Sequence, residues 1–191
     1  MKKLLYPLLW FTPLLTLFAQ TEGMITYEMK TNLHRNLPKE REDMKAMIPE
    51  FNTVRLQLLF NPSESLYKPL IDEEDDVVNQ GGGGRMMIMR RAMNSETYFN
   101  QDEIVSTTKQ EFMGKEYLIS DTLKVSPWKF GTETKTIAGY NCRMAYYTDS
   151  SRPDRTQEVT AWFTDQIRPS LGPERFNTLP GTVLAVDING G

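Results

Sequence analysis

Apolar and polar residues alternate along most of the chain with a period of two. The alternation is clearest over residues 25–29, where Ile25, Tyr27 and Met29 are separated by polar residues, and over residues 54–60. A period of two places every second side chain on the same face of a strand. Similar patterns predict further strands at residues 65–67, 86–90, 96–99, 104–112, 117–120, 130–137, 143–148, 157–164 and 183–188. The fold class is therefore predicted to be mainly β.

One segment has the pattern of a helix. Pro38 suits a first helical turn, and Met44, Met47 and Ile48 form a stripe at helical spacing before Pro49. A single short helix beside about ten strands favours a curved antiparallel sheet or an open half-barrel, with the helix against the sheet or at one end of it. A closed barrel and a sandwich are the alternatives.

The first 19 residues have the pattern of a secretory signal peptide. Lys2 and Lys3 precede an uncharged run over residues 4–18, and Ala19 follows. The run contains two prolines and is shorter than the ~20 apolar residues that cross a bilayer as a helix, although an uncleaved anchor is the alternative. We expect cleavage after Ala19 and a periplasmic or secreted protein without a membrane span. The single cysteine, Cys142, is too distant to carry a lipid anchor at the cleavage site.

Residues 20–191 are predicted to form a single β-rich domain, a length that suits one substantial core. The whole chain has a formal net charge of −3, and removal of Lys2 and Lys3 makes it more negative. An acidic protein without a basic stripe is not expected to bind nucleic acid. Cys142 lies in an alternating run and is expected to be buried as a small apolar residue, with an intermolecular disulfide as the alternative.

Residues 72–84 interrupt the strand pattern. A run of acidic residues is followed by four glycines, Gly81–Gly84, and predicts a flexible acidic and glycine-rich loop inserted between strands. Four methionines follow the glycines: Met86, Met87, Met89 and Met93. Thioethers suit Cu(I), and a flexible tether can bring several together, so these residues are a candidate Cu(I) site. Packing in the core or in an apolar groove is the alternative.

The residue types needed for catalysis are sparse. His34 is the only histidine, and no nucleophile motif accompanies it, so a loop position is the expected role. Pairs of carboxylates are recognised by geometry and not by spacing, which leaves a carboxylate-based hydrolase open. Trp128 and Trp162 are expected in the core, although a concave sheet can also present aromatic residues to a ligand. No cofactor and no catalytic residue are predicted.

The last quarter of the chain has a distinctive order of residues. Ala161-Trp162-Phe163 and Gly172-Pro173 precede Leu179-Pro180-Gly181 and an apolar strand. This order resembles the GLPGLI family of small exported proteins from Bacteroidota. The resemblance extends to segments along most of the mature chain, namely residues 23–28, 59–61, 64–67, 119–121, 128–129, 133–137 and 139–145. That family has no settled activity, so the resemblance implies a lineage and a β-rich fold.

Two departures from the family pattern concern its hallmark and the length of the chain. The first Gly and the Leu-Ile pair of the hallmark are replaced, whereas Pro180 and Gly181 are kept. We expect Leu179, Pro180 and Gly181 to form a structural hinge, in which Gly181 can adopt a positive φ without a Cβ clash. The chain stops at Gly191, where family members continue for further strands. Both a truncated and a naturally short protein agree with this.

These patterns favour an exported binding or structural module of the cell envelope over an enzyme. Its expected partner is an apolar ligand, a peptide or an outer-membrane protein, held on a concave β-sheet. A metal-handling protein that uses the methionine segment is the second hypothesis, and a hydrolase is the third.

Overall fold

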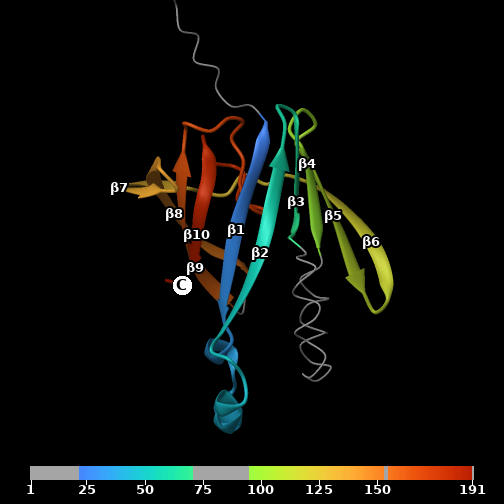
Figure 1. Cartoon of the computed structure of the whole chain (residues 1–191), viewed down its shortest axis with the longest axis vertical. Helices are drawn as coiled ribbons and strands as arrows, with labels where there is room; N and C mark the ends of the chain where they lie inside the picture. The colour runs from blue at the N-terminus through green and yellow to red at the C-terminus, as the bar shows by residue number, and fades with distance from the viewer. Residues whose placement is uncertain (1–21, 71–94, 153–154, 191) are drawn as a thin grey trace, which may run out of the picture.

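A computed structural model describes residues 22–70, 95–152 and 155–190, whose strands form two antiparallel sheets (Figure 1). Sheet A contains, in spatial order, β1 (Gly23–Asn32), β2 (Phe51–Phe60), β3 (Glu64–Pro69), β4 (Glu96–Asn100), β5 (Val105–Phe112) and β6 (Lys115–Thr122). Sheet B contains β10 (Thr182–Ile188), β9 (Arg155–Thr164), β8 (Tyr140–Arg152) and β7 (Lys129–Ile137). The mainly β, antiparallel prediction is confirmed, and neither sheet closes into a barrel.

Two tight turns connect neighbouring strands. Met113 and Gly114 join β5 to β6 with φ values of 53° and 77°, and Ala138 and Gly139 join β7 to β8 with φ values of 50° and 87°. Two-residue turns in which both φ values are positive match the right-handed twist of the strands that they connect. The turn at Met113 and Gly114 also fixes the register of the β5–β6 hairpin.

The predicted helix is present in a different form. Residues Lys39–Ala46 form a 3₁₀ helix, preceded by a shorter one at His34–Asn36, and no α-helix occurs in the described part of the chain. The 3₁₀ helices join β1 to β2 and extend past the end of that hairpin (Figure 1). Met47 is 83% exposed, so this residue of the expected apolar stripe does not pack on a sheet. Three residues per turn keep positions i and i+3 on one face but turn position i+4 away from it, so the three-residue stripe is not maintained.

The main core lies between sheet A and a segment that follows β9. The inner face of sheet A contributes Leu56, Leu58, Phe60, Tyr67 and Phe99, and residues Ile167 and Leu171 of the later segment complete the cluster. Tyr27 on β1 donates a hydrogen bond from its hydroxyl to the Val183 carbonyl of β10 at 2.6 Å. Burial raises the pKa of Tyr27, which keeps this hydroxyl protonated and able to donate. Side chains therefore join the two sheets.

Three predicted features lie outside the described residues. They are the signal peptide at residues 1–19, the flexible loop at residues 72–84 and the candidate strand at residues 86–90. Among the residues that are described, no helix has the length and apolar character needed to cross a membrane.

Candidate functional site

The predicted hinge lies where the segment after β9 returns to sheet B. Leu179 is buried in a cluster with Phe163 and Val183, whereas Pro180 is exposed. Gly181 is buried and does not have a positive φ, so the hinge does not use the left-handed conformation that glycine allows. A Cβ at Gly181 would lie 2.8 Å from the carbonyl carbon of Thr164 and 3.0 Å from Cδ2 of Phe163. Glycine is needed here because the backbone of β9 passes too close for a side chain.

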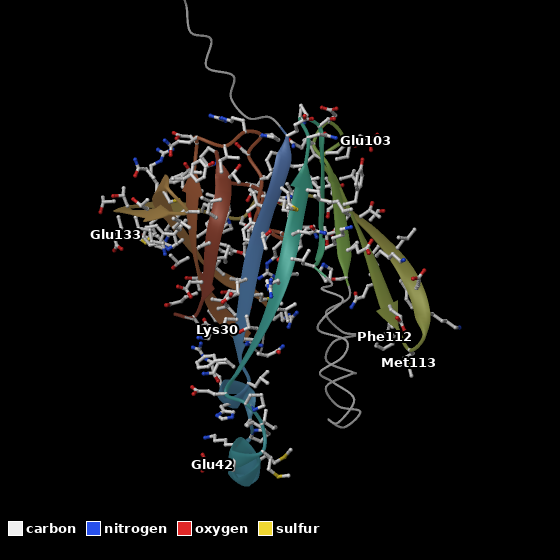
Figure 2. All side chains as sticks on the ribbon, in the orientation of Figure 1. Lys30, Glu42, Glu103, Phe112, Met113 and Glu133 are labelled. Carbon is white, nitrogen blue, oxygen red and sulfur yellow. The ribbon has the colours of Figure 1, made fainter. Side chains whose placement is uncertain are left out.

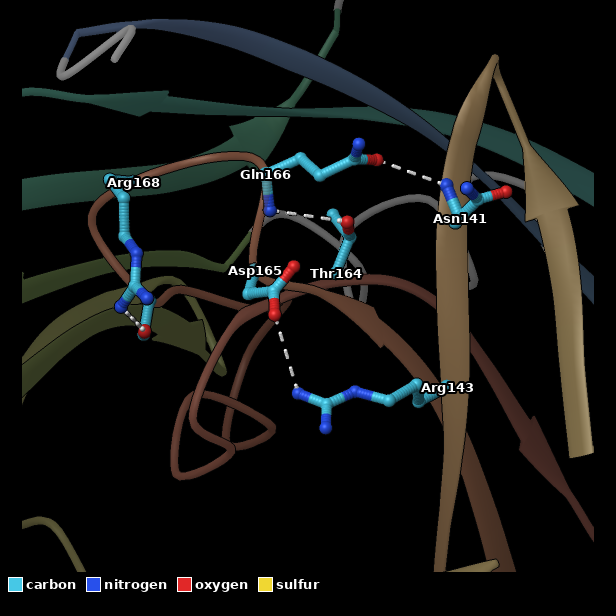
Figure 3. A network of polar contacts seen from close by, with 7 residues as sticks. Asn141, Arg143, Thr164, Asp165, Gln166 and Arg168 are labelled. Atoms are coloured by element: carbon cyan, nitrogen blue, oxygen red, sulfur yellow. Dashed lines mark hydrogen bonds and ion pairs between the residues drawn. The ribbon is translucent and has the colours of Figure 1, made fainter. Parts of the chain in front are cut away.

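The segment after β9 comprises residues 165–181. Polar contacts hold the start of this segment against sheet B (Figure 3). The Gln166 side chain accepts a hydrogen bond from the Asn141 backbone at 3.1 Å, and Arg143 pairs with Asp165 at 3.6 Å. Arg143 and Asp165 are both more than half exposed, so the ion pair adds little to stability. At the other end of the segment, the Thr182 hydroxyl donates to the carbonyls of Ile167 and Pro169. The network positions a connection and contains no nucleophile paired with a base.

His34 takes a structural position. Its Nε2 lies 2.8 Å from the Ile48 carbonyl, which requires Nε2 to carry the proton and donate it. The described residues contain no group of three or more His, Cys, Asp or Glu side chains that could hold a metal ion. The four methionines proposed to bind Cu(I), Met86, Met87, Met89 and Met93, lie outside the described residues, so that site stays a prediction.

Trp128 and Trp162 pack against sheet B, as expected. Trp128 contacts Tyr147 edge to face at 4.6 Å between ring centroids and donates from Nε1 to the Thr178 hydroxyl at 2.8 Å. Trp162 is buried, with the Lys135 ammonium 4.2 Å from its ring centroid. Both rings therefore stabilise the fold and neither is displayed to a ligand.

Cys142 on β8 is fully buried, and its thiol donates to the Tyr140 carbonyl at 3.6 Å. Burial raises the pKa of this thiol, which keeps it protonated near neutral pH. A buried, protonated thiol is a poor nucleophile and is not placed to pair with another chain. The structure favours the packing role over an intermolecular disulfide.

We expect a thiol reagent to label native Cys142 at least about 100-fold more slowly than the unfolded chain, because labelling then requires an opening of the fold. The rate is measured by mass spectrometry with and without denaturant. Val125→Cys supplies a matched reference, since Val125 is 80% exposed. Equal labelling of the two thiols in the native variant would show that Cys142 is accessible.

A cluster of exposed apolar side chains lies on the β5–β6 hairpin. Phe112, Tyr117 and Ile119, here called the hairpin face, are 61%, 46% and 54% exposed. Together with Gln110 they line a hollow of about 310 Å³. All four residues lie on the inner face of sheet A, the same face that is buried under Ile167 and Leu171 farther along the sheet. Figure 2 shows Phe112 and Met113 at the tip of the hairpin, away from sheet B.

In the part of the chain that the structure describes, nothing covers the hairpin face, because sheet A is wider than the segment that packs on it. The buried cluster extends from β1 to Phe99 on β4 and includes no residue of β5 or β6. Sequence reasoning predicted strands here and did not single out this face. The spacing of Tyr117 and Ile119 shows that they share a face, but local spacing carries no information on what packs against it.

The opposite face of the same strands is polar. A groove of about 320 Å³ crosses the outer face of sheet A, lined by Gln57, Lys68, Pro69, Leu70, Glu96, Lys109, Glu111 and Glu116. Lys109 pairs with Glu116 at 2.9 Å, and this contact raises the pKa of Lys109. Lysines and glutamates are interspersed along the groove, as is usual for a solvated face. The groove is therefore polar, although Leu118 on the same outer face is 74% exposed.

One protein-family model matches a part of this chain. Residues 149–185 match a family model described as "Protein of unknown function (Porph_ging)", and this region runs from the end of β8 into β10. The match does not confirm the GLPGLI resemblance, which stays a prediction. No curated protein matches this chain.

Two solved structures of PNGF-II, in space groups C2 and P2₁, are similar in fold. Their TM-scores are 0.52 and 0.51, and each aligns with 74% of this chain at 17% identity. This chain spans 23% and 24% of the length of those two chains. At such low identity the likeness extends to the fold alone.

Proposed function

We propose that this protein is an exported, non-catalytic interaction module of the cell envelope, which binds a protein partner through the hairpin face. The observation that carries the proposal is the exposure of Phe112, Tyr117 and Ile119 side by side on one face. Clustered exposed apolar residues are typical of interaction surfaces, whereas scattered ones are ordinary. Export is supported by the basic and apolar start of the sequence.

A protein partner suits this surface better than a small apolar ligand. Four residues line the hollow, and three of them are more than 45% exposed. A site for a small molecule usually encloses most of its ligand, which a hollow on one hairpin does not. A flat partner surface needs no enclosure, because each side covers the other.

Site-specific photo-crosslinking in the native host tests the proposal. p-Benzoyl-phenylalanine replaces Phe112 in one variant and Phe130, on β7, in another. Phe130 is a matched control because it is 62% exposed against 61% for Phe112. We expect a discrete crosslinked protein from position 112, which Ile119→Lys abolishes and position 130 does not form. Crosslinking at position 112 that is no stronger than at position 130 would overturn the proposal.

A further inference from the structure

β6 ends sheet A, and its outer edge is unusually suited to pairing. Among the described residues only β5 pairs with it, and its register is free of bulges. Natural edge strands are protected by charges, prolines or bulges. The central residues 117–120 of β6 are Tyr, Leu, Ile and Ser, which provide none of these. Leu118 is 74% exposed. Within the described ranges, the middle of β6 is therefore an uncharged strand edge on which no other strand pairs.

The register of the hairpin determines which backbone groups face that edge. The Leu123 amide donates to the Ile104 carbonyl at 3.0 Å, which places a hydrogen-bonded pair one residue beyond the end of the hairpin. Hydrogen-bonded and non-hydrogen-bonded pairs alternate along an antiparallel ladder. Counting from this pair, Glu116, Leu118 and Ser120 direct their N–H and C=O groups away from β5 and toward the open edge.

We propose that a second copy of this chain pairs with β6, antiparallel and about a two-fold axis at Leu118. This inference goes beyond the proposed function, because the second copy binds at the strand edge and not on the hairpin face. A two-fold axis perpendicular to the sheet keeps the inner faces of both copies on one side and places the same surface on each. Residues 116, 118 and 120 of one copy then bond to residues 120, 118 and 116 of the other.

Charge and polarity select this register over its neighbours. With the axis at Leu118, Lys115 lies opposite the partner's Asp121, and Tyr117 lies opposite the partner's Ile119. Opposite charges, and an aromatic residue beside a β-branched one, are favourable cross-strand pairs. A shift of the axis to Tyr117 places Lys115 opposite the partner's Ile119. A shift to Ile119 places Tyr117 opposite the partner's Asp121. Leu118 also lies near the middle of β6, which maximises the overlap.

The pairing joins the two hairpin faces into one apolar surface. Tyr117 and Ile119 of each copy become neighbours across the new ladder, on the same side of the sheet. The Leu118 side chains of the two copies meet on the outer face, where each covers the other. Asp121 pairs with Lys124 at 3.6 Å within one chain, and both side chains are highly exposed, so Asp121 can also accept Lys115 of the partner.

The mass of the purified mature protein in solution tests the pairing. Light scattering over a concentration series is expected to show a monomer–dimer equilibrium. Leu118→Lys places like charges on the axis and should raise the dimer Kd by at least about tenfold. Val125→Lys is the matched control, because Val125 is 80% exposed and lies outside β6, and its Kd should not change. A monomer at every soluble concentration, or equal Kd values for both variants, would overturn the inference.

A disulfide tests the register. Leu118→Cys should form a dimer under mild oxidation, since a hydrogen-bonded pair has a Cα separation of about 5.5 Å, within disulfide range. Glu116→Cys is the control on the same strand and face, and its counterpart lies about 13 Å away, four residues along the strand. The wild type, whose single cysteine Cys142 is buried, should form no disulfide-linked dimer under the same conditions. Crosslinking of Glu116→Cys that equals or exceeds that of Leu118→Cys would contradict the register.

The two proposals fail separately. A photo-crosslinked product from position 112 that contains a different protein, together with a monomeric mass, overturns the second copy and supports the interaction module. A dimer in solution without any product from position 112 in the host supports edge pairing and contradicts binding through the hairpin face.

Discussion

Gly181→Ala is expected to lower the free energy of unfolding by about 3 kcal/mol. The added Cβ would lie 2.8 Å from the Thr164 carbonyl carbon, which belongs to the backbone of β9 and cannot rotate aside. Relief requires β9 and β10 to separate at a place where Thr164 and Thr182 pair. Urea denaturation followed by far-ultraviolet circular dichroism measures the change.

Gly139→Ala distinguishes this mechanism from backbone strain. Gly139 has a φ of 87°, and a Cβ there would meet nothing within 4 Å. An L-residue in this left-handed conformation costs about 1 kcal/mol. The loss at Gly181 should therefore exceed the loss at Gly139. The opposite order would show that sheet B accommodates the added methyl group and that close approach is not the reason for glycine.

Ile167→Ala is expected to destabilise the fold by about 2–5 kcal/mol, the usual cost of removing a buried branched side chain. Ile167 is 7% exposed and packs with Leu171 against the inner face of sheet A. The same substitution at Ile119, which is 54% exposed, should cost less than about 1 kcal/mol, the span of strand propensities. Both changes remove the same atoms, and the midpoints and slopes of urea denaturation compare them.

The comparison also bears on the hairpin face. A loss at Ile119 as large as that at Ile167 would mean that Ile119 is buried in solution and that its exposure is not available to a partner. A small loss leaves Ile119 free for a role other than stability. Equal slopes for the two variants would establish that neither change alters the surface exposed on unfolding.

The strands were predictable from the sequence because alternation is a local property. Tyr27, Leu56 and Leu58 stand in the register that period two requires, and all face the core. Helical spacing likewise predicted a helix after Pro38, but it did not predict the 3₁₀ geometry of that helix. A 3₁₀ helix has hydrogen bonds between residues three apart, whereas an α-helix has them between residues four apart. The spacing of apolar residues in the sequence does not determine which of the two forms.

Properties that depend on distant packing could not be predicted. The need for glycine at position 181 was expected, but the cause is the approach of β9 and not a turn conformation. The division into two sheets and the exposure of Phe112, Tyr117 and Ile119 depend on how far residues 165–181 extend across sheet A. The tertiary arrangement therefore decides which apolar faces are covered, and the candidate surface follows from it.

The contribution of residues 165–181 to the core of sheet A has a consequence for the order of synthesis. Sheet A is complete in sequence at Thr122, yet Ile167, Leu171 and the Val183 carbonyl that accepts from Tyr27 come more than 40 residues later. Until that stretch emerges, the inner face of β1–β4 lacks the two buried residues Ile167 and Leu171 that complete its cluster. Such exposed strands are prone to aggregate, so we expect a chain that ends before residue 165 to aggregate more readily than the whole chain.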